Sequence, residues 1–267
     1  MADVKAPGAS GTGFLERDGF RLAYADFHPR DGAGEPVLLI HGFASNLNVN
    51  WIGPGWTKTL TDAGYRCIAF DHRGHGQSSG GTDPDAYTPL AMAEDAAALL
   101  DRLEIRRAHV FGYSMGARVA AFTALHFPER VASLILGGLG YGMVDGVGDW
   151  DPIASALLAD DPATVTHPRG KMFRAFADQT RSDRESLAAC IAKSRELIDA
   201  DLIGRITQPT LVAVGTTDDI AGSAAKLAAL MADAEPFAIE GRDHMLSVGD
   251  RTFKARVLEF LKAHPLS

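Results

Sequence analysis

The stretch that decides the fold is VFGYSMGARVA, residues 110–120, where an apolar run passes through glycines into an alanine-rich segment. Gly112 lies two residues before Ser114, and Gly116 lies two residues after it. A strand that enters a helix through so sharp a turn crowds the turning residue, and glycines at these positions remove the Cβ atoms that would collide. The pattern predicts a strand, a tight turn and a helix. Ser114 is then either an exposed nucleophile or the N-cap of that helix, a position that serine favours.

Around this turn, apolar runs alternate with helical patterns along most of the chain. Most of the apolar runs are continuous, as strands covered on both faces require, and the alternation with helices predicts an α/β fold with a mostly parallel sheet. The expected strands are residues 20–28, 36–42, 65–71, 108–113, 131–138, 209–215 and 234–241. The expected helices of this layered part are residues 55–64, 89–105, 114–127, 222–233 and 251–264. The start of the chain, residues 1–14, has the composition of a loose polar lead-in.

The alternation stops between residues 139 and 205, where helical patterns follow one another without a strand between them. An insertion that leaves the sheet and returns to it is expected to form a small helical lid. The sequence therefore predicts a core of residues 1–138 and 206–267 and a helical cap of residues 139–205.

Composition and charge exclude several classes of function. The chain has 267 residues, with 34 acidic and 26 basic side chains and a formal net charge of −8, which disfavours binding to nucleic acid. No apolar run approaches the length of a membrane span, and no signal peptide is visible, so we expect a cytoplasmic protein without a membrane partner. Cys67 and Cys190 are expected to be buried and inert, and no residues with metal-ligand spacing are visible, so neither a metal nor an organic cofactor is expected. The oligomeric state cannot be deduced.

A serine hydroxyl needs a base to become a nucleophile, and the base needs an orienting acid. His244 follows the last expected strand, at the carboxyl edge where open α/β sheets place their sites, and it is the expected base. The expected acid is Asp218, which follows the preceding strand; its neighbour Asp219 remains open. The other histidines are expected to lie on the surface, at the ends of elements or in other loops.

Attack on an ester carbonyl creates an oxyanion, which backbone N–H groups can stabilise. One donor is expected from Met115, directly after Ser114. A second is expected from Phe43, in the loop that follows residues 36–42. The glycine-rich loop FDHRGHGQSSG, residues 70–80, lacks the lysine of a phosphate-binding loop; we expect Asp71, Arg73 and Ser78 to form a hydrogen-bonded network that fixes it.

Taken together, these motifs resemble the α/β-hydrolase family. The resemblance rests on HGF at 41–43, DHRGHGQS at 71–78, GYSMG at 112–116, PTLVAVGTTD at 209–218 and GRDHM at 241–245, and it runs from about residue 14 to residue 264. It implies an α/β-hydrolase fold, with an eight-stranded sheet flanked by helices, an antiparallel second strand and a lid inserted after the sixth strand. It also implies that Ser114, Asp218 and His244 are the triad and that Phe43 and Met115 supply the oxyanion donors. This sequence departs from many relatives in TTDDIAG, residues 216–222, where no proline follows the acid, and this departure leaves Asp219 open as the acid.

The leading functional hypothesis is a serine hydrolase that cleaves carboxylic esters of small to medium acyl compounds through an acyl-enzyme. The same triad could instead act on a thioester, a lactone or a carbon–carbon bond, or transfer an acyl group to peroxide. A third hypothesis is a noncatalytic ligand-binding relative. An apolar substrate pocket is expected, and no charged cluster in the cap predicts an anionic substrate. Its expected lining residues are Leu47, Trp51, Met143, Trp150, Phe173 and Phe176.

Overall fold

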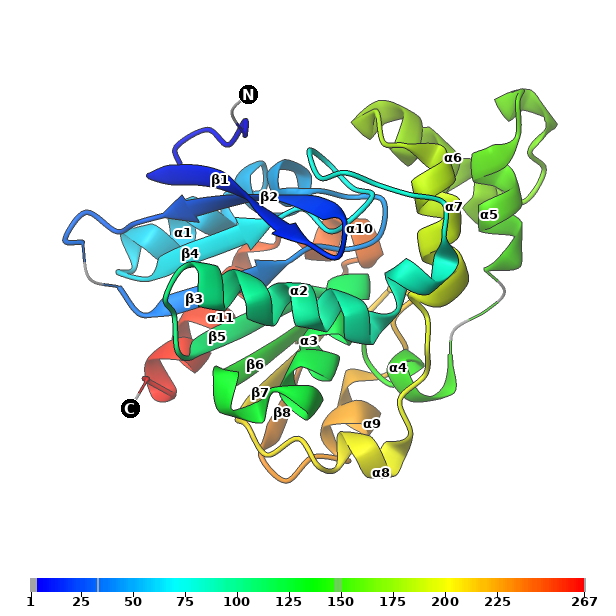
Figure 1. Cartoon of the computed structure of the whole chain (residues 1–267). Coiled ribbons are helices and arrows are strands. Elements are labelled where there is room, and N and C mark those ends of the chain that lie inside the picture. The colour runs from blue at the N-terminus through cyan, green and yellow to red at the C-terminus, as the bar shows by residue number, and fades with distance from the viewer. Residues whose placement is uncertain (1–3, 33, 147, 149, 267) are drawn as a thin grey trace.

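The computed structural model describes residues 4–32, 34–146, 148 and 150–266, and its centre is an eight-stranded sheet (Figure 1). The strands are β1 (Gly11–Arg17), β2 (Phe20–Phe27), β3 (Pro36–Ile40), β4 (Arg66–Phe70), β5 (Ala108–Tyr113), β6 (Val131–Gly137), β7 (Thr210–Gly215) and β8 (Ala234–Ile239). Their order across the sheet is β1-β2-β4-β3-β5-β6-β7-β8. β2 is antiparallel to both of its neighbours, and the remaining pairs are parallel. The predicted fold class is confirmed.

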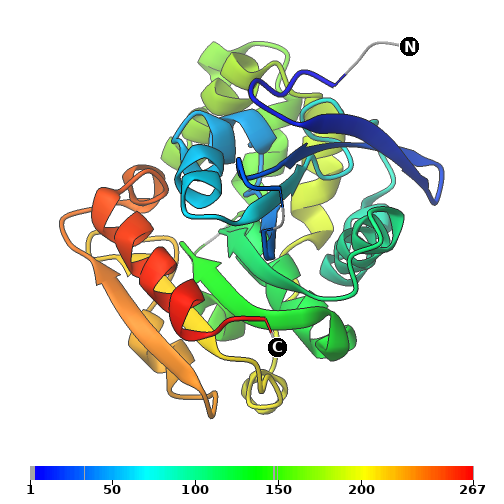
Figure 2. The same ribbon diagram turned by 90° about the vertical axis from the view of Figure 1, so that its left-hand side faces the viewer.

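Helices cover both faces of the sheet (Figure 2). The flanking helices are α1 (Trp56–Asp62), α2 (Pro89–Arg102), α3 (Met115–His126), α9 (Ala224–Ala228) and α11 (Arg251–Ala263). Alternate residues of β3 point to opposite faces. Leu39 packs in a core cluster with Trp56 of α1 and Val257 of α11, and Leu38 packs in a second cluster with residues of α2 and α3. This burial on both faces explains why the strands are continuously apolar.

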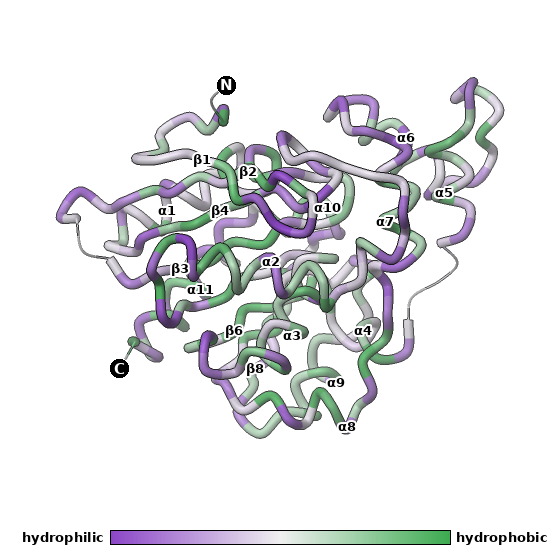
Figure 3. The backbone as a smooth tube through the Cα atoms, viewed as in Figure 1, coloured by the Kyte–Doolittle hydropathy of each residue, from purple (hydrophilic) through white to green (hydrophobic). Residues whose placement is uncertain are grey.

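Hydropathy follows the same layers. Figure 3 shows hydrophobic residues along the inner strands and hydrophilic residues concentrated in outer loops and turns. Within the described residues, no helix is both long enough and apolar enough to span a membrane.

The segment between β6 and β7 contains helices and no strand among its described residues. It comprises α4 (Gly142–Asp145), α5 (Asp151–Leu158), a short turn of 3-10 helix (Pro162–Thr164), α6 (Pro168–Thr180), α7 (Arg184–Lys193) and α8 (Ala200–Ile203). Figure 1 shows α5, α6 and α7 grouped together beyond the sheet. Phe173 of α6 contacts Phe43, which follows β3, and Cys190 of α7 contacts Met115, which follows β5. The helical segment therefore covers the carboxyl ends of two central strands.

The start of the chain differs from the sequence-based expectation. Residues Gly11 to Phe14 belong to β1 rather than to a loose lead-in, and they pair with Asp26 to Ala23 of β2. β1 is one of the two edge strands of the sheet, and its residues are exposed or half-buried. An exposed edge strand needs no apolar run. The sequence pattern therefore did not predict β1, which begins with glycine and threonine residues.

Candidate active site

The turn after β5 holds Ser114 in a strained backbone conformation. Its φ of 56° and ψ of −116° lie where residues other than glycine rarely occur. A Cβ atom on Gly112 would lie 2.0 Å from the carbonyl oxygen of Gly116, and one on Gly116 would lie 2.0 Å from that of Ile40. The two glycines are thus required by close packing. Ser114 occupies the N-cap position of α3, yet its side chain makes no capping hydrogen bond, so capping does not account for the hydroxyl.

The structure brings Ser114, His244 and Asp218 together from three separate loops. Nε2 of His244 lies 3.0 Å from Oγ of Ser114, and Nδ1 lies 2.8 Å from Oδ2 of Asp218. His244 is the first residue of α10 (His244–Ser247), after β8, and Asp218 follows β7. Because a carboxylate only accepts hydrogen bonds, Nδ1 carries the proton and Nε2 of the neutral ring is the acceptor for the serine O–H. This is the tautomer that a general base requires.

Backbone groups fix the acid and the base in place. Oδ1 of Asp218 accepts hydrogen bonds from the backbone N–H groups of Ile220 at 2.8 Å and Ala221 at 3.0 Å, which leaves Oδ2 for the imidazole. The carboxylate of Asp219 is 85% exposed and lies 3.9 Å from Arg169, so Asp218 is the residue that contacts His244. The buried hydroxyl of Tyr113, whose pKa is raised by burial, donates to the carbonyl oxygen of His244 at 2.6 Å.

The backbone N–H groups of Met115 and Phe43 make no hydrogen bond to any acceptor among the described residues. Met115 is the first residue of α3, where an N–H group has no intrahelical partner. Phe43 lies in the loop after β3, and it lines a cavity together with Ser114. Asn50 holds this loop by accepting a hydrogen bond from the N–H of Gly42 at 3.0 Å. Sequence patterns gave no signal for Asn50, because its contact depends on how the loop folds back.

Three histidines lie buried beneath this loop. The rings of His41 and His72 are 4.7 Å apart, and those of His41 and His75 are 5.3 Å apart. Burial lowers the pKa of His41 to about 3 and that of His75 to about 4, and it holds the pKa of His72 well below its usual value. These rings are therefore neutral near pH 7. Nε2 of His41 accepts a hydrogen bond from the N–H of His72 at 3.0 Å, so the cluster braces the loop.

The expected network in the loop after β4 forms only in part. Asp71 accepts hydrogen bonds from the backbone N–H groups of Leu47 and Gln77 at 2.7 and 2.8 Å, and Oγ of Ser78 donates to the carbonyl oxygen of Asp71 at 2.6 Å. Burial raises the pKa of Asp71 to about 6. The bond to Leu47 ties this loop to the one that carries Phe43.

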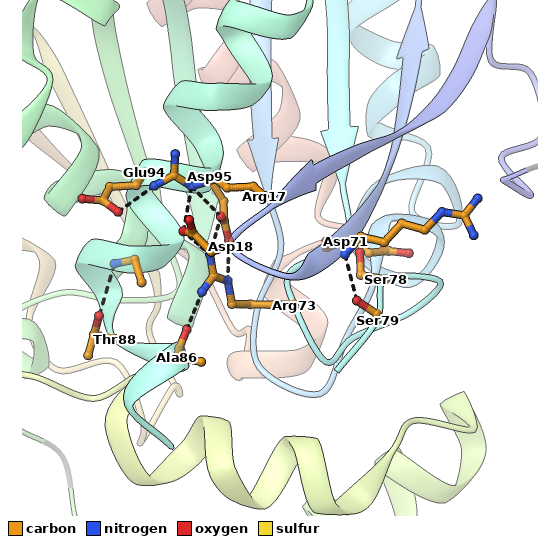
Figure 4. Close-up of polar contacts among 12 residues, drawn as sticks. Arg17, Asp18, Asp71, Arg73, Ser78, Ser79, Ala86, Thr88, Glu94 and Asp95 are labelled. Carbon is orange, nitrogen blue, oxygen red and sulfur yellow. Dashed lines mark hydrogen bonds and ion pairs between the residues drawn. The ribbon is translucent and has the colours of Figure 1, made fainter. Parts of the chain in front are cut away.

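Arg73 belongs to a different network (Figure 4). Its guanidinium group donates to both carboxylate oxygens of Asp95 on α2, at 2.7 and 2.6 Å, and to the carbonyl oxygen of Ala86 at 2.9 Å. Arg17 of β1 lies 3.3 Å from the same carboxylate. The side chain of Arg73 is therefore not part of the network in its own loop, because a buried carboxylate on α2 is its partner; only its carbonyl oxygen bonds within the loop, with Nδ1 of His75 at 3.0 Å.

We expect replacement of Arg73 by leucine to lower the free energy of unfolding by about 3–5 kcal/mol, because it removes the closest partner of a buried charge. The side chains of Arg73 and Asp95 are only 3% and 0% exposed. The control is Lys58→Leu, since Lys58 pairs with Asp62 on the surface at 78% and 58% exposure, and its loss should cost at most about 0.5 kcal/mol. Urea unfolding measures both variants. Equal losses of unfolding free energy in the two variants would contradict the conclusion that Arg73 is the main partner of the buried Asp95 carboxylate.

Two cavities meet at Ser114, and Phe43 lines both. The first has about 550 Å³ of empty space, part of it open to solvent, and is mainly apolar; its remaining walls are Gly42, Ser45, Val49, Asn50, Tyr113, Met172, Phe173, Phe176, His244, Met245 and Val248. The second has about 420 Å³ of empty space, part of it also open to solvent; its remaining walls are Met115, Arg118, Leu139, Gly142, Trp150, Ile191, Ser194, Arg195 and Ile220. The expected pocket residues Phe173, Phe176 and Trp150 are among these walls.

The structure places Leu47, Trp51 and Met143 elsewhere. All three are fully buried in the hydrophobic core, and Trp51 packs edge-on against Phe111 of β5. Trp51 lies in the π-helical turn Asn48–Ile52; Val49 and Asn50 of this turn line the first cavity, and Trp51 does not. The sequence could not predict which residues of this turn line the cavity, because the orientation of a short turn depends on its packing against the rest of the chain.

Known proteins are similar to this chain in sequence and in architecture. The sequence profile of a family described as "alpha/beta hydrolase fold" matches residues 35–169. A non-heme chloroperoxidase from Streptomyces lividans is 32% identical, over 92% of this chain and 98% of that protein. The crystal structure of a hydrolase from Pseudomonas aeruginosa superposes with a TM-score of 0.76 at 30% identity, covering 95% of this chain and 99% of that one. An esterase from Exiguobacterium antarcticum has the same fold, with a TM-score of 0.74 at 22% identity over 96% of this chain and 98% of its own.

Proposed function

The chain belongs to the α/β-hydrolase family, and from this premise we propose that it hydrolyses carboxylic esters of small to medium acyl compounds, with Ser114 as the nucleophile. The observation that carries the proposal is the 3.0 Å contact between Nε2 of His244 and Oγ of Ser114, with Asp218 bonded to the opposite ring nitrogen. Family membership indicates a hydrolase but does not specify the bond that is cleaved. The apolar first cavity supports esters as the substrates.

In the first step, Oγ of Ser114 attacks the ester carbonyl carbon while Nε2 of His244 takes its proton. Asp218 stabilises the imidazolium ion that forms. The carbonyl oxygen becomes an oxyanion, and the free N–H groups of Met115 and Phe43 are suited to stabilise it. The alcohol then leaves with the proton from His244, and an acyl-enzyme remains.

In the second step, water replaces the alcohol as the partner of His244. The imidazole takes a proton from water, and the resulting hydroxide attacks the acyl carbon. Ser114 leaves with the proton from His244, and the carboxylic acid is released. Every proton passes through one ring nitrogen, so no further acid or base is needed.

The shape of the first cavity supports a preference for acyl chains of limited length. Met172, Phe173 and Phe176 of α6 line this cavity, and so do Met245 and Val248, which follow His244 in the sequence. Apolar walls with few polar groups favour hydrocarbon parts of a substrate.

The experiment is a series of p-nitrophenyl esters from acetate to laurate, assayed at pH 7.5 with the folded protein. We expect saturable turnover, with kcat/KM highest for a chain between the extremes, because the apolar walls of the first cavity cover a limited number of methylene groups. A folded protein that hydrolyses none of these esters would refute the proposal.

Acyl transfer to hydrogen peroxide is a second candidate, favoured by the name of the Streptomyces lividans relative, a non-heme chloroperoxidase. Hydrogen peroxide would take the place of water in the second step and release a peroxy acid. Turnover of an ester in the presence of hydrogen peroxide, with the products separated by chromatography, distinguishes the two acceptors. A peroxy acid that forms only when the protein is present would favour this candidate.

A further inference from the structure

The second cavity is positively charged, although the chain carries a formal net charge of −8. Arg118 and Arg195 line it, and none of the described residues in its walls is acidic. Arg118 comes from α3, and Arg195 follows the end of α7. The sequence showed no charged cluster because the two arginines come from separate segments that meet only in the folded chain.

Arg118 is a fixed charge close to the nucleophile. It lies one helical turn beyond Ser114 on α3. Its guanidinium group donates to the carbonyl oxygens of Met143 at 3.1 Å, Glu196 at 2.5 Å and Gly142 at 3.4 Å. Burial lowers the pKa of Arg118 to about 10, so it is charged at neutral pH. Carbonyl groups satisfy its donors, and the negative charge of Glu196 acts against the effect of burial on its pKa.

Arg195 is the available cation of this cavity. It makes no hydrogen bond or ion pair with any residue that the structure describes, and its guanidinium carbon lies 3.9 Å from the centre of the Trp150 ring. Burial, followed by repulsion from Arg118 and Arg169, lowers its pKa to about 9, while exposed Asp151 acts in the opposite direction. A bound anion would relieve this repulsion and occupy donors that have no acceptor among the residues that the structure describes.

The neighbouring wall offers one neutral donor and apolar surface. Oγ of Ser194 is buried and makes no hydrogen bond of ordinary geometry with the described residues. Leu139, Ile191 and Ile220 complete the surroundings. A guanidinium fork binds a planar pair of oxygens well, and one free guanidinium balances a single negative charge.

We propose that the second cavity binds a carboxylate of the substrate, with Arg195 as its ion-pair partner and Ser194 as an additional hydrogen-bond donor. The inference rests on the proposed function, because it specifies the ester that Ser114 cleaves. That ester carries a free carboxylate on its acyl or its alcohol side, and the scissile carbonyl group lies where the two cavities meet. Arg118 supplies a fixed positive charge in the same cavity.

The test compares esters that differ only in a terminal carboxylate. Monomethyl succinate, glutarate and adipate are each paired with methyl butanoate, pentanoate and hexanoate, and 4-acetoxybutyrate is paired with butyl acetate. Hydrolysis is followed by pH-stat titration. For at least one pair, we expect the wild-type protein to have a higher kcat/KM for the anionic ester. Arg195→Gln should lower this preference about 10- to 100-fold, as expected for the loss of hydrogen bonds to a charged group.

Two further variants separate charge and geometry from general damage. Lys193→Gln removes the same charge two residues away, but Lys193 pairs with Asp85 on the surface and does not line the cavity, so the preference should not change. Arg195→Lys keeps the charge without the planar fork and should give an intermediate preference. Circular dichroism checks that each variant is folded.

Binding without turnover provides a second measurement. Titration calorimetry should show that the Ser114→Ala protein binds monoanionic esters more tightly than their neutral partners. Adding Arg195→Gln should remove this difference in affinity. If neutral esters are hydrolysed but no pair shows a preference for the anion, the inference is overturned and the proposed function stands. If no ester is hydrolysed but anion binding depends on Arg195, the proposed function fails and the anion site stands.

Discussion

Replacement of Ser114 by alanine is expected to lower kcat for ester hydrolysis by about 10⁵- to 10⁶-fold, the scale found when a triad serine is removed elsewhere. The reason is that Oγ forms the covalent bond to the acyl group, and no other described hydroxyl lies within hydrogen-bond distance of Nε2 of His244. Residual turnover would come from water acting next to the free N–H groups of Met115 and Phe43. Initial rates with a p-nitrophenyl ester measure the effect.

The matched control is Ser155→Ala, which makes the same change on the exposed surface of α5. It should leave kcat within about twofold, as expected for a surface substitution away from the site. The Ser114→Ala protein should remain folded, because Ser114 makes no side-chain cap. If this variant keeps a tenth or more of the wild-type rate, Ser114 is not the nucleophile.

Replacement of Asp218 by asparagine is expected to lower kcat by about 10⁴-fold, because it reverses the tautomer of His244. The N–H groups of Ile220 and Ala221 require an oxygen at the position of Oδ1. The asparagine amide would therefore turn its NH₂ group toward Nδ1 of His244, and the ring proton would move to Nε2. A protonated Nε2 cannot accept the proton of Ser114. Initial rates of ester hydrolysis over a series of pH values, compared with wild type, measure the loss.

Asp219→Asn is the control for this variant, since its carboxylate is 85% exposed and does not contact His244. We expect its kcat to stay within about threefold of wild type, because surface substitutions away from such contacts have small effects. The assignment of the acid is refuted if Asp219→Asn loses activity while Asp218→Asn retains it.

Most of the layered fold could be predicted because buried parallel strands require continuous apolar runs. Residues 36–42, 108–113 and 131–138 each contain an observed strand, β3, β5 and β6. β1 escaped prediction because an exposed edge strand has no such constraint. The stretch 186–203 has a helical composition throughout, yet α7 ends at Lys193 and α8 begins at Ala200, a break that local composition did not reveal.

The central geometry of the site was predictable because glycine spacing fixes the turn at Ser114, and topology brings the loops after β7 and β8 to the same edge. The role of Asn50 and the position of Arg195 in the second cavity could not be predicted, since both depend on contacts between segments that are distant in the sequence. Trp51 is a further example. The sequence suggested a pocket residue, because Trp51 is an aromatic residue close to the site in sequence, but its side chain packs into the core.

The central claim is that an acyl group becomes bonded to Ser114 during turnover. Rapid acid quenching of the protein with a p-nitrophenyl ester, followed by peptide mass spectrometry, tests it directly. The account predicts that the peptide containing Ser114 gains the mass of the acyl group within the first turnover. An acyl group found only on another residue, or turnover with no acylated peptide at saturating substrate and rapid quenching times, would contradict it.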